Sequence, residues 1–185
     1  MTAALVIIDV QNAVLRDPAN RGRQPIVDAA LDDMVGRLQR VQRVARRAGA
    51  PVIVVQHDGG PGHRLAPGSE GWRNRDEIAP IAGEPLVRKA SCDAFFETDL
   101  AERLAERAVT RLVIGGCMTQ FCVDTTCRRA VSVGYDVTLI ADGHMTADMG
   151  DLTFAQIIAH HNALLDGLDA GAHAIELRAA EQIAF

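Results

Sequence analysis

The feature that most constrains the fold of this chain is the alternation of short apolar, β-branched runs with longer segments of helical period. The runs typical of buried strands cover residues 4–10, 51–56, 84–89, 111–116, 135–142 and 172–177. The helical patterns cover residues 26–48, 98–108, 120–134 and 153–167, and the last of them opens with a Thr153/Gln156 capping box. This alternation predicts a three-layer α/β/α, Rossmann-like fold with a mostly parallel sheet of five or six strands.

Length and charge restrict the class of protein further. The chain has 185 residues, enough for one domain with a buried core, and we expect a single domain over residues 1–185. Its net charge is −5 and no basic tract is present, which argues against a nucleic-acid or an anionic-membrane partner. No apolar run approaches the roughly 20 residues of a membrane span.

The cysteines and the N-terminus indicate a compartment. The start of the chain, "MTAALVIIDVQN", lacks the basic segment and the small-residue cleavage site of a signal peptide. We therefore expect a cytoplasmic protein whose four cysteines stay reduced. They are Cys92, Cys117, Cys122 and Cys127.

Reactive side chains follow three of the predicted strands. The first strand runs into Asp9, the third ends at Lys89, and the fourth leads through a glycine pair to Cys122. Ligands of open parallel α/β sheets bind beyond the carboxyl ends of the strands, so these three residues are expected to converge there. Taken singly, Asp9 can cap a turn, Lys89 can be solvated, and Cys122 can be a small core residue.

The segment "GGCMTQFC" indicates which role the cysteines have. On a helix starting near Thr119, Cys122 and Cys127 point about 140° apart, so they do not share one metal ion. Their spacing also differs from the C-x₂₋₄-C pairs of zinc sites. A cysteine in the first turn of a helix is where the helix dipole favours the nucleophilic thiolate. The preceding turn supplies backbone N–H groups for an oxyanion. We therefore interpret Cys122 as the nucleophile.

These residues stand in segments that resemble the isochorismatase-like cysteine hydrolases, a family that includes nicotinamidases and N-carbamoylsarcosine amidohydrolases. The resemblance covers nearly the whole chain. It is carried by "LVIIDVQN", "VVQHDG…PGSEGW", "LVRKASCDAFFETDL" and, most specifically, "LVIGGCMTQFCVDTTCRRAVSVGYDVTLIAD". It implies an isochorismatase-type hydrolase fold and an Asp-Lys-Cys triad made of Asp9, Lys89 and Cys122.

The roles implied for the triad are chemically consistent. Asp9 would act as general base and then acid, and Cys122 would attack a carbonyl to form a thioester. Lys89 would keep Asp9 ionised and favour the thiolate. The backbone N–H groups of Met118 and Cys122 would bind the oxyanion, and the resemblance also implies a cis peptide bond between Cys117 and Met118.

Departures from the family bear on the substrate and on a metal. Nicotinamidases bind a metal through an Asp-x-His motif, but this chain has His57 and Gly59 at those positions. His57, Asp58 and His63 are the side chains that could regroup around an ion; we expect no metal and no cofactor, with His57 satisfied or facing the substrate. The family's "QNDF" is "QNAV" here, which argues against nicotinamide. The expected substrate contacts are Gln11, Trp72 and Phe121. The alternative for Trp72 is a purely structural role, in which it packs its loop onto the core.

The remaining histidines give weaker indications. His160 and His161 are adjacent on a predicted helix, point about 100° apart, and are expected in the core or at an interface. His144 follows the fifth strand and is a weaker candidate for contact with the substrate.

The sequence favours a cysteine hydrolase that cleaves a C–N amide bond of a small molecule. One alternative is the cleavage of a vinyl ether, as in isochorismatases. The other is a non-catalytic small-molecule binder or a thiol redox sensor, in which Cys117 would resolve an oxidised Cys122. The resemblance also implies a homo-oligomer, either a dimer or a tetramer.

Overall fold

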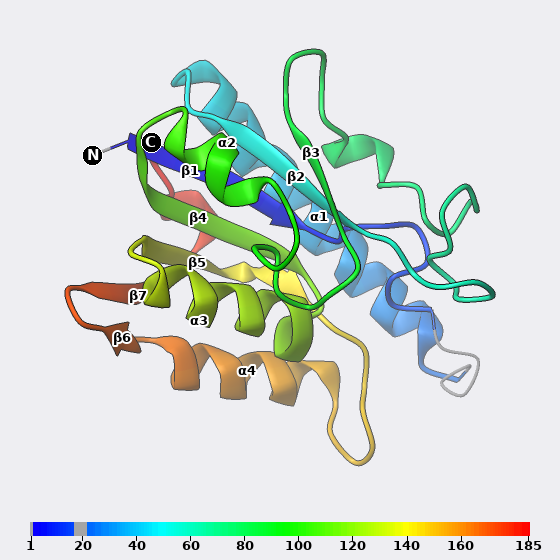
Figure 1. Ribbon diagram of the computed structural model, residues 1–185. Coiled ribbons are helices and arrows are strands. Elements are labelled where there is room, and N and C mark those ends of the chain that lie inside the picture. Colours follow the sequence, from blue (N-terminus) through cyan, green and yellow to red (C-terminus); the bar gives the residue numbers. More distant parts are fainter. Residues whose placement is uncertain (1, 17–21) are drawn as a thin grey trace.

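The computed structural model describes residues 2–16 and 22–185 and shows a central twisted sheet between two helical layers (Figure 1). Within these residues the sheet has seven strands in the order β3-β2-β1-β4-β5-β7-β6. Neighbouring strands are parallel except for the β6–β7 pair. The strands are β1 (Thr2–Ile8), β2 (Val52–His57), β3 (Leu86–Lys89), β4 (Val109–Cys117), β5 (Asp136–Met145), β6 (Asp169–Ala170) and β7 (His173–Arg178).

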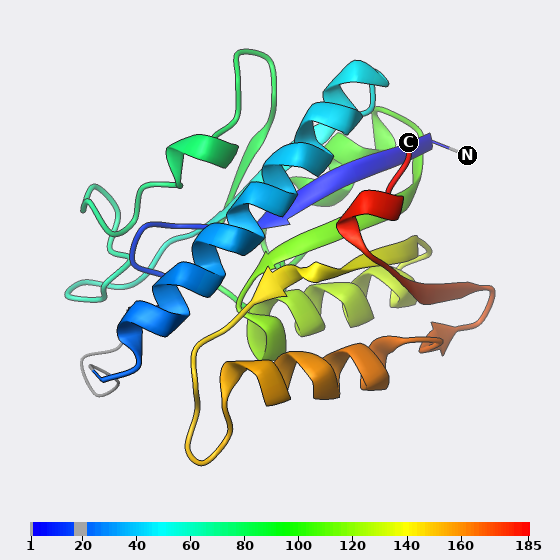
Figure 2. The ribbon, with the colours of Figure 1, turned by 180° about the vertical axis from the view of Figure 1, so that it is seen from behind.

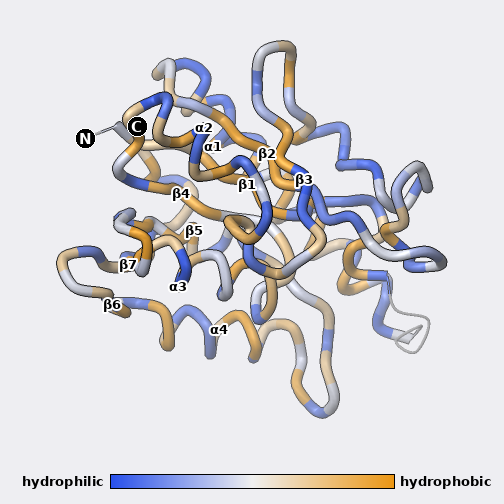
Figure 3. The backbone as a smooth tube through the Cα atoms, viewed as in Figure 1, coloured by the Kyte–Doolittle hydropathy of each residue, from blue (hydrophilic) through white to orange (hydrophobic). Residues whose placement is uncertain are grey.

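The helices cover the two faces of the sheet. They are α1 (Gln24–Arg47), α2 (Leu100–Ala105), α3 (Asp124–Ser132) and α4 (Phe154–Leu165). One core lies between α1 and the sheet, and a second core joins the other face to residues of α2, α3 and the end of α4. Figure 2, turned by 180°, shows α1 running across the other face of the sheet, with the short C-terminal turn Ala180–Gln182 beside it. The central strands are therefore buried on both sides, which explains why they read as continuous apolar runs (Figure 3).

The structure confirms the predicted fold class and changes its details. The sheet has more strands than the predicted five or six, because the two-residue β6 forms an antiparallel hairpin with β7 that is too short to produce an apolar pattern. The predicted helix over residues 98–108 is helical only over Leu100–Ala105. The Thr153/Gln156 capping box is present at the start of α4. In the part of the chain described, no helix combines the length and the apolar character needed to cross a membrane.

The turn after β4 also differs from the prediction. Residues Thr119–Val123 form a single π-helical turn, and the regular helix α3 starts only at Asp124. Cys122 therefore lies before the α-helix and not within its first turn. The physical reason is visible in the backbone hydrogen bonds: the N–H of Val123 donates to the carbonyl of Met118 at 3.2 Å, an i to i−5 bond that widens the turn.

Candidate active site

The parallel register of the sheet brings Asp9, Lys89 and Cys122 to one edge. Ile8 pairs with Gly116 across β1 and β4, and His57 pairs with Lys89 across β2 and β3. Asp9 follows directly after β1, Lys89 ends β3, and Cys122 lies in the turn after β4. The convergence predicted from the strand ends is therefore present in the structure.

Asp9 and Lys89 form a buried ion pair. The Lys89 Nζ donates to Asp9 Oδ2 at 2.6 Å and to the backbone carbonyl of Ser91 at 2.8 Å. Both side chains are at most 2 % exposed, so water barely screens their attraction. Asp9 has a positive φ of 50°, a conformation that aspartate tolerates better than most residues.

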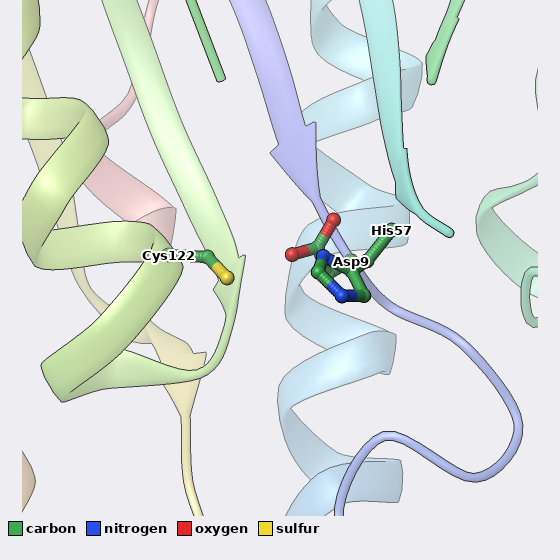
Figure 4. A group of neighbouring side chains, drawn as sticks. All are labelled: Asp9, His57 and Cys122. Atoms are coloured by element: carbon green, nitrogen blue, oxygen red, sulfur yellow. The ribbon is translucent and has the colours of Figure 1, made fainter. Parts of the chain in front are cut away.

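Cys122 faces Asp9 and His57 from the opposite side (Figure 4). One ligand atom each of Asp9, His57 and Cys122 lies within 4.8 Å of the others. Cys122 comes from the turn after β4, whereas Asp9 and His57 come from the ends of β1 and β2. The sulfur and the carboxylate are thus close enough for the carboxylate to accept the thiol proton.

Burial controls the proton affinities in this group. Burial raises the pKa of Asp9, and the Lys89 ammonium opposes this effect. Burial also raises the pKa of the Cys122 thiol, the negative charge of Asp9 adds to the rise, and Lys89 opposes it. For Lys89, burial lowers the pKa, but the attraction of Asp9 and Cys122 outweighs it and the net shift is upward. These directions favour a neutral Cys122 thiol beside the Asp9–Lys89 ion pair. Burial and the charge of Asp9 oppose the thiolate that the sequence pattern predicts, and Lys89 favours it, so the thiolate stays a prediction.

The turn that carries Cys122 is held close to β1. Gly116 has a φ of +128°, and a Cβ placed there would lie 2.0 Å from the carbonyl oxygen of Ile8. The Cys117–Met118 peptide bond is cis, as the family resemblance implies. The N–H groups of Phe121 and Val123 both donate to the Met118 carbonyl. The backbone N–H groups of Met118 and Cys122 remain the proposed oxyanion donors.

A buried chain of hydrogen bonds connects this turn to α4. The amide nitrogen of Asn162 donates to the carbonyl of Ala141 at 3.0 Å, so its oxygen faces His144 Nε2 at 2.8 Å. Nε2 must then carry the proton, and His144 Nδ1 accepts from the Thr119 hydroxyl at 2.9 Å. Burial lowers the pKa of His144 to about 4, which keeps this ring neutral. His144 is thus placed to position the turn and does not line the cavity.

A cavity of about 330 Å³ opens over the group. Cys122, Asp9, His57, Met118 and Phe121 contribute to its lining. The rest of the lining consists of Val14, Leu15, Arg16, His63, Arg64, Leu65, Cys92, Ala147, Asp148 and Met149. Its walls are therefore mostly apolar, with cationic side chains among them.

Two of the three expected substrate contacts lie outside this lining. Gln11 is buried, and its amide nitrogen donates to the backbone carbonyls of His57 and Trp72, so it ties β1 to the loop after β2. The Trp72 indole N–H donates to Asp58 Oδ1 at 2.7 Å, and Arg88 stacks over its ring. These side chains are occupied in holding the loop. Of the three, only Phe121 faces the cavity.

The metal site of nicotinamidases does not fit this chain. Gly59 offers no ligand atom, and the Asp58 carboxylate is committed to the Trp72 indole and to Arg88. His63 Nδ1 accepts from the Leu65 N–H at 3.1 Å. Regrouping of His57, Asp58 and His63 around an ion therefore has no support in these contacts.

His160 and His161 lie on α4, outside the cavity lining. His161 Nδ1 lies 2.8 Å from the Ile157 carbonyl, and the two imidazole rings contact each other edge to face.

Sequence reasoning missed the role of Asn162, Arg64 and Met149, because their segments carry no pattern that places them near the strand ends.

The fold and the position of this site, beyond the carboxyl ends of a parallel sheet, are those of the isochorismatase-like α/β proteins. Residues 3–172 match the isochorismatase domain model. The chain belongs to the isochorismatase family.

Individual relatives extend this comparison. The chain is 37 % identical to a streptothricin hydrolase of Streptomyces noursei, over 79 % of this chain and 50 % of that protein. The chain thus spans about half the length of the first curated relatives it matches. It is 28 % identical to a ureidoacrylate amidohydrolase of Stutzerimonas stutzeri, over 86 % of this chain and 75 % of that protein. The solved structure of an isochorismatase from Pseudomonas putida KT2440 superposes with a TM-score of 0.85 at 29 % identity, covering 98 % of this chain and 89 % of that one.

Proposed function

We propose that this protein is a cysteine hydrolase that cleaves a C–N amide bond of a small molecule through a thioester on Cys122. The observation that carries the proposal is the buried Asp9–Lys89 ion pair facing the Cys122 sulfur. The names of two relatives, a streptothricin hydrolase and a ureidoacrylate amidohydrolase, support hydrolysis and, in the second case, an amide substrate.

The acylation step follows from the proton affinities. Asp9 accepts the thiol proton as the Cys122 sulfur attacks the carbonyl carbon, because the raised pKa makes this carboxylate a better base. The backbone N–H groups of Met118 and Cys122 stabilise the oxyanion. Asp9 then returns the proton to the leaving nitrogen, the C–N bond breaks, and a thioester remains.

Deacylation reverses these roles. Asp9 accepts a proton from water while the water oxygen bonds to the thioester carbonyl carbon. The thioester C–S bond then breaks. The proton on Asp9 returns to sulfur, which restores the neutral thiol. Lys89 stays protonated throughout, because its raised pKa keeps it cationic beside both anions.

A screen of ammonia or amine release tests the proposal. The panel comprises N-carbamoyl amines, ureido acids, lactams and simple primary amides. We expect turnover of at least one class, and a loss of about 10³-fold or more in Cys122→Ser and Asp9→Asn. Cys92→Ser changes the cavity wall but no reacting atom, so its loss should stay below about tenfold. Turnover that survives Cys122→Ser would refute the thioester route.

The alternatives make different predictions. A vinyl-ether hydrolase would release no ammonia and would produce a carbonyl compound from an enol ether. A thiol sensor would form a Cys117–Cys122 disulfide with mild peroxide. Cys117 is fully buried, and burial together with the charge of Asp9 raises its pKa, which disfavours a resolving thiolate.

We further propose a cytoplasmic homo-oligomer, either a dimer or a tetramer, that binds no nucleic acid. The net charge of −5 supports the last point. Ala159 and Leu164 on α4 are exposed apolar residues that an oligomer interface would cover. Light scattering of the purified protein would measure its mass in solution, and a monomer would contradict the proposal.

A further inference from the structure

Three different ligand types meet at the base of the cavity. Asp9 offers a carboxylate oxygen, His57 an imidazole nitrogen and Cys122 a sulfur, and these atoms lie within 4.8 Å of one another (Figure 4). The family's metal motif does not include this set, and the mechanism above uses only two of its members.

Two of these residues have buried polar atoms without a partner. Asp9 Oδ1 and His57 Nδ1 are buried, and neither makes a hydrogen bond to any of the described residues. Lys89 occupies only the other carboxylate oxygen, Oδ2. A buried acceptor left unpaired is unfavourable, so a cation between these groups would satisfy an existing deficit.

The donor set distinguishes among cations. Calcium and magnesium prefer sites made of oxygen ligands, whereas thiolate, imidazole and carboxylate together are typical of zinc. A zinc site with three protein ligands leaves a fourth position free, and all three of these residues line the cavity.

We propose that Asp9, His57 and Cys122 bind one zinc ion that reversibly inhibits this protein. Binding forms a Zn–S bond as the Cys122 proton leaves to solvent, with no change of oxidation state. The bound ion occupies the nucleophile and the general base together. The Lys89 ammonium repels a dication, so we expect micromolar rather than nanomolar affinity. Zinc binding itself does not depend on the proposed hydrolase activity.

A zinc titration of the metal-free full-length protein against a chromogenic chelator tests the site. We expect one zinc per chain in the wild type and an affinity at least tenfold lower in His57→Asn and in His57→Gln. Both substitutions of His57 are made because one of them could misfold. Circular dichroism tests whether each variant is folded. His63→Asn is the matched control, since His63 lines the same cavity but is outside the donor set. Its affinity should stay within twofold of the wild type.

Cobalt supplies a spectroscopic readout of the sulfur ligand. Co²⁺ bound to the wild type should show a thiolate charge-transfer band that disappears in Cys122→Ser and persists in Cys92→Ser, the other cysteine of the cavity lining. Equal losses of zinc affinity in His57→Asn and His63→Asn, or a band that survives Cys122→Ser, would overturn the proposal.

Inhibition is measured separately. If the protein hydrolyses an amide, zinc should inhibit it, a chelator should restore activity, and the inhibition constant should rise in His57→Asn by the same factor as the dissociation constant. A protein that binds zinc as described but cleaves no amide would refute the proposed function and leave the zinc site intact. A protein that cleaves amides but binds no zinc at this site would refute the zinc site and leave the proposed function intact.

Discussion

At Cys122, burial and the neighbouring charges decide how the thiol can react. The charge of Asp9 raises the pKa of this thiol and the charge of Lys89 lowers it. Cys122 lies in a π turn that leads directly into α3, rather than in the first turn of the α-helix that the sequence pattern predicts. In the proposed mechanism, the neutral thiol needs Asp9 to accept its proton during the attack.

This arrangement predicts opposite effects of two substitutions on alkylation by iodoacetamide. Asp9→Asn removes a negative charge, so the pH midpoint of Cys122 alkylation should move down. Lys89→Met removes a positive charge, so the midpoint should move up. Peptide mass spectrometry across a pH series measures both, with Cys92 in the same samples as the internal control. Shifts of the same sign in the two variants would contradict the assigned charges.

The Thr119 hydroxyl should position the turn that holds Cys122. Thr119→Val keeps the shape of the side chain but removes the donor to His144 Nδ1. We expect kcat to fall about tenfold with KM within about twofold, because the lost bond misplaces the nucleophile without altering the cavity walls. Thr119→Ser keeps the hydroxyl and should retain most of kcat. If both variants lose activity equally, the hydrogen bond is not the cause.

His144 should make stability depend on pH. Its folded pKa, about 4, lies below the ordinary value of 6.5, so the unfolded state binds the proton first. Its contribution is therefore full above pH 6.5, falls as the pH drops toward 4, and levels off below that. The loss is about 3 kcal/mol across this window. Urea denaturation at several pH values should show a steeper acid loss in the wild type than in His144→Gln; parallel curves would exclude His144 as the source.

At the scale of elements, the contact between β1 and β4 controls where the turn that carries Cys122 begins. Gly116 lies against the backbone of Ile8, and no side chain fits between them. Gly116→Ala should therefore destabilise the protein by about 3 kcal/mol or more. Gly36 lies in the middle of α1, and a Cβ there would meet only the Arg40 guanidinium at 3.9 Å, an ordinary contact, so Gly36→Ala should stabilise by about 0.5–1 kcal/mol. Thermal and urea unfolding of the pair provide the test, and a tolerated Gly116→Ala would contradict this packing.

Elements with strong patterns could be predicted from the sequence, and those set by tertiary contacts could not. Burial requires apolar residues throughout β1, β2 and β4 and at helical spacing along α1. These patterns can therefore be recognised in the sequence. The two-residue β6 depends on its pairing with β7 and has no period of its own. The π turn likewise depends on how Met118 and Val123 meet after β4.

At the scale of the whole molecule, the sheet explains why part of the site could be predicted. Asp9, Lys89 and Cys122 follow parallel strands, so topology alone brings them to one edge. The loops that close the cavity follow no such rule. Trp72 and Gln11 hold the loop after β2, and Asn162 approaches the turn from α4. These placements depend on packing between distant segments, which no local pattern encodes.

Trapping an acyl group on the enzyme tests the Cys122 mechanism most directly. The protein is mixed with the amide panel, quenched in acid within a turnover, digested and analysed by mass spectrometry. We expect the peptide containing Cys122 to gain the mass of the substrate acyl group, to lose it with hydroxylamine, and to show no gain in Cys122→Ser. Amide turnover without any adduct on Cys122, retained in Cys122→Ser, would show that the carbonyl is attacked by another group.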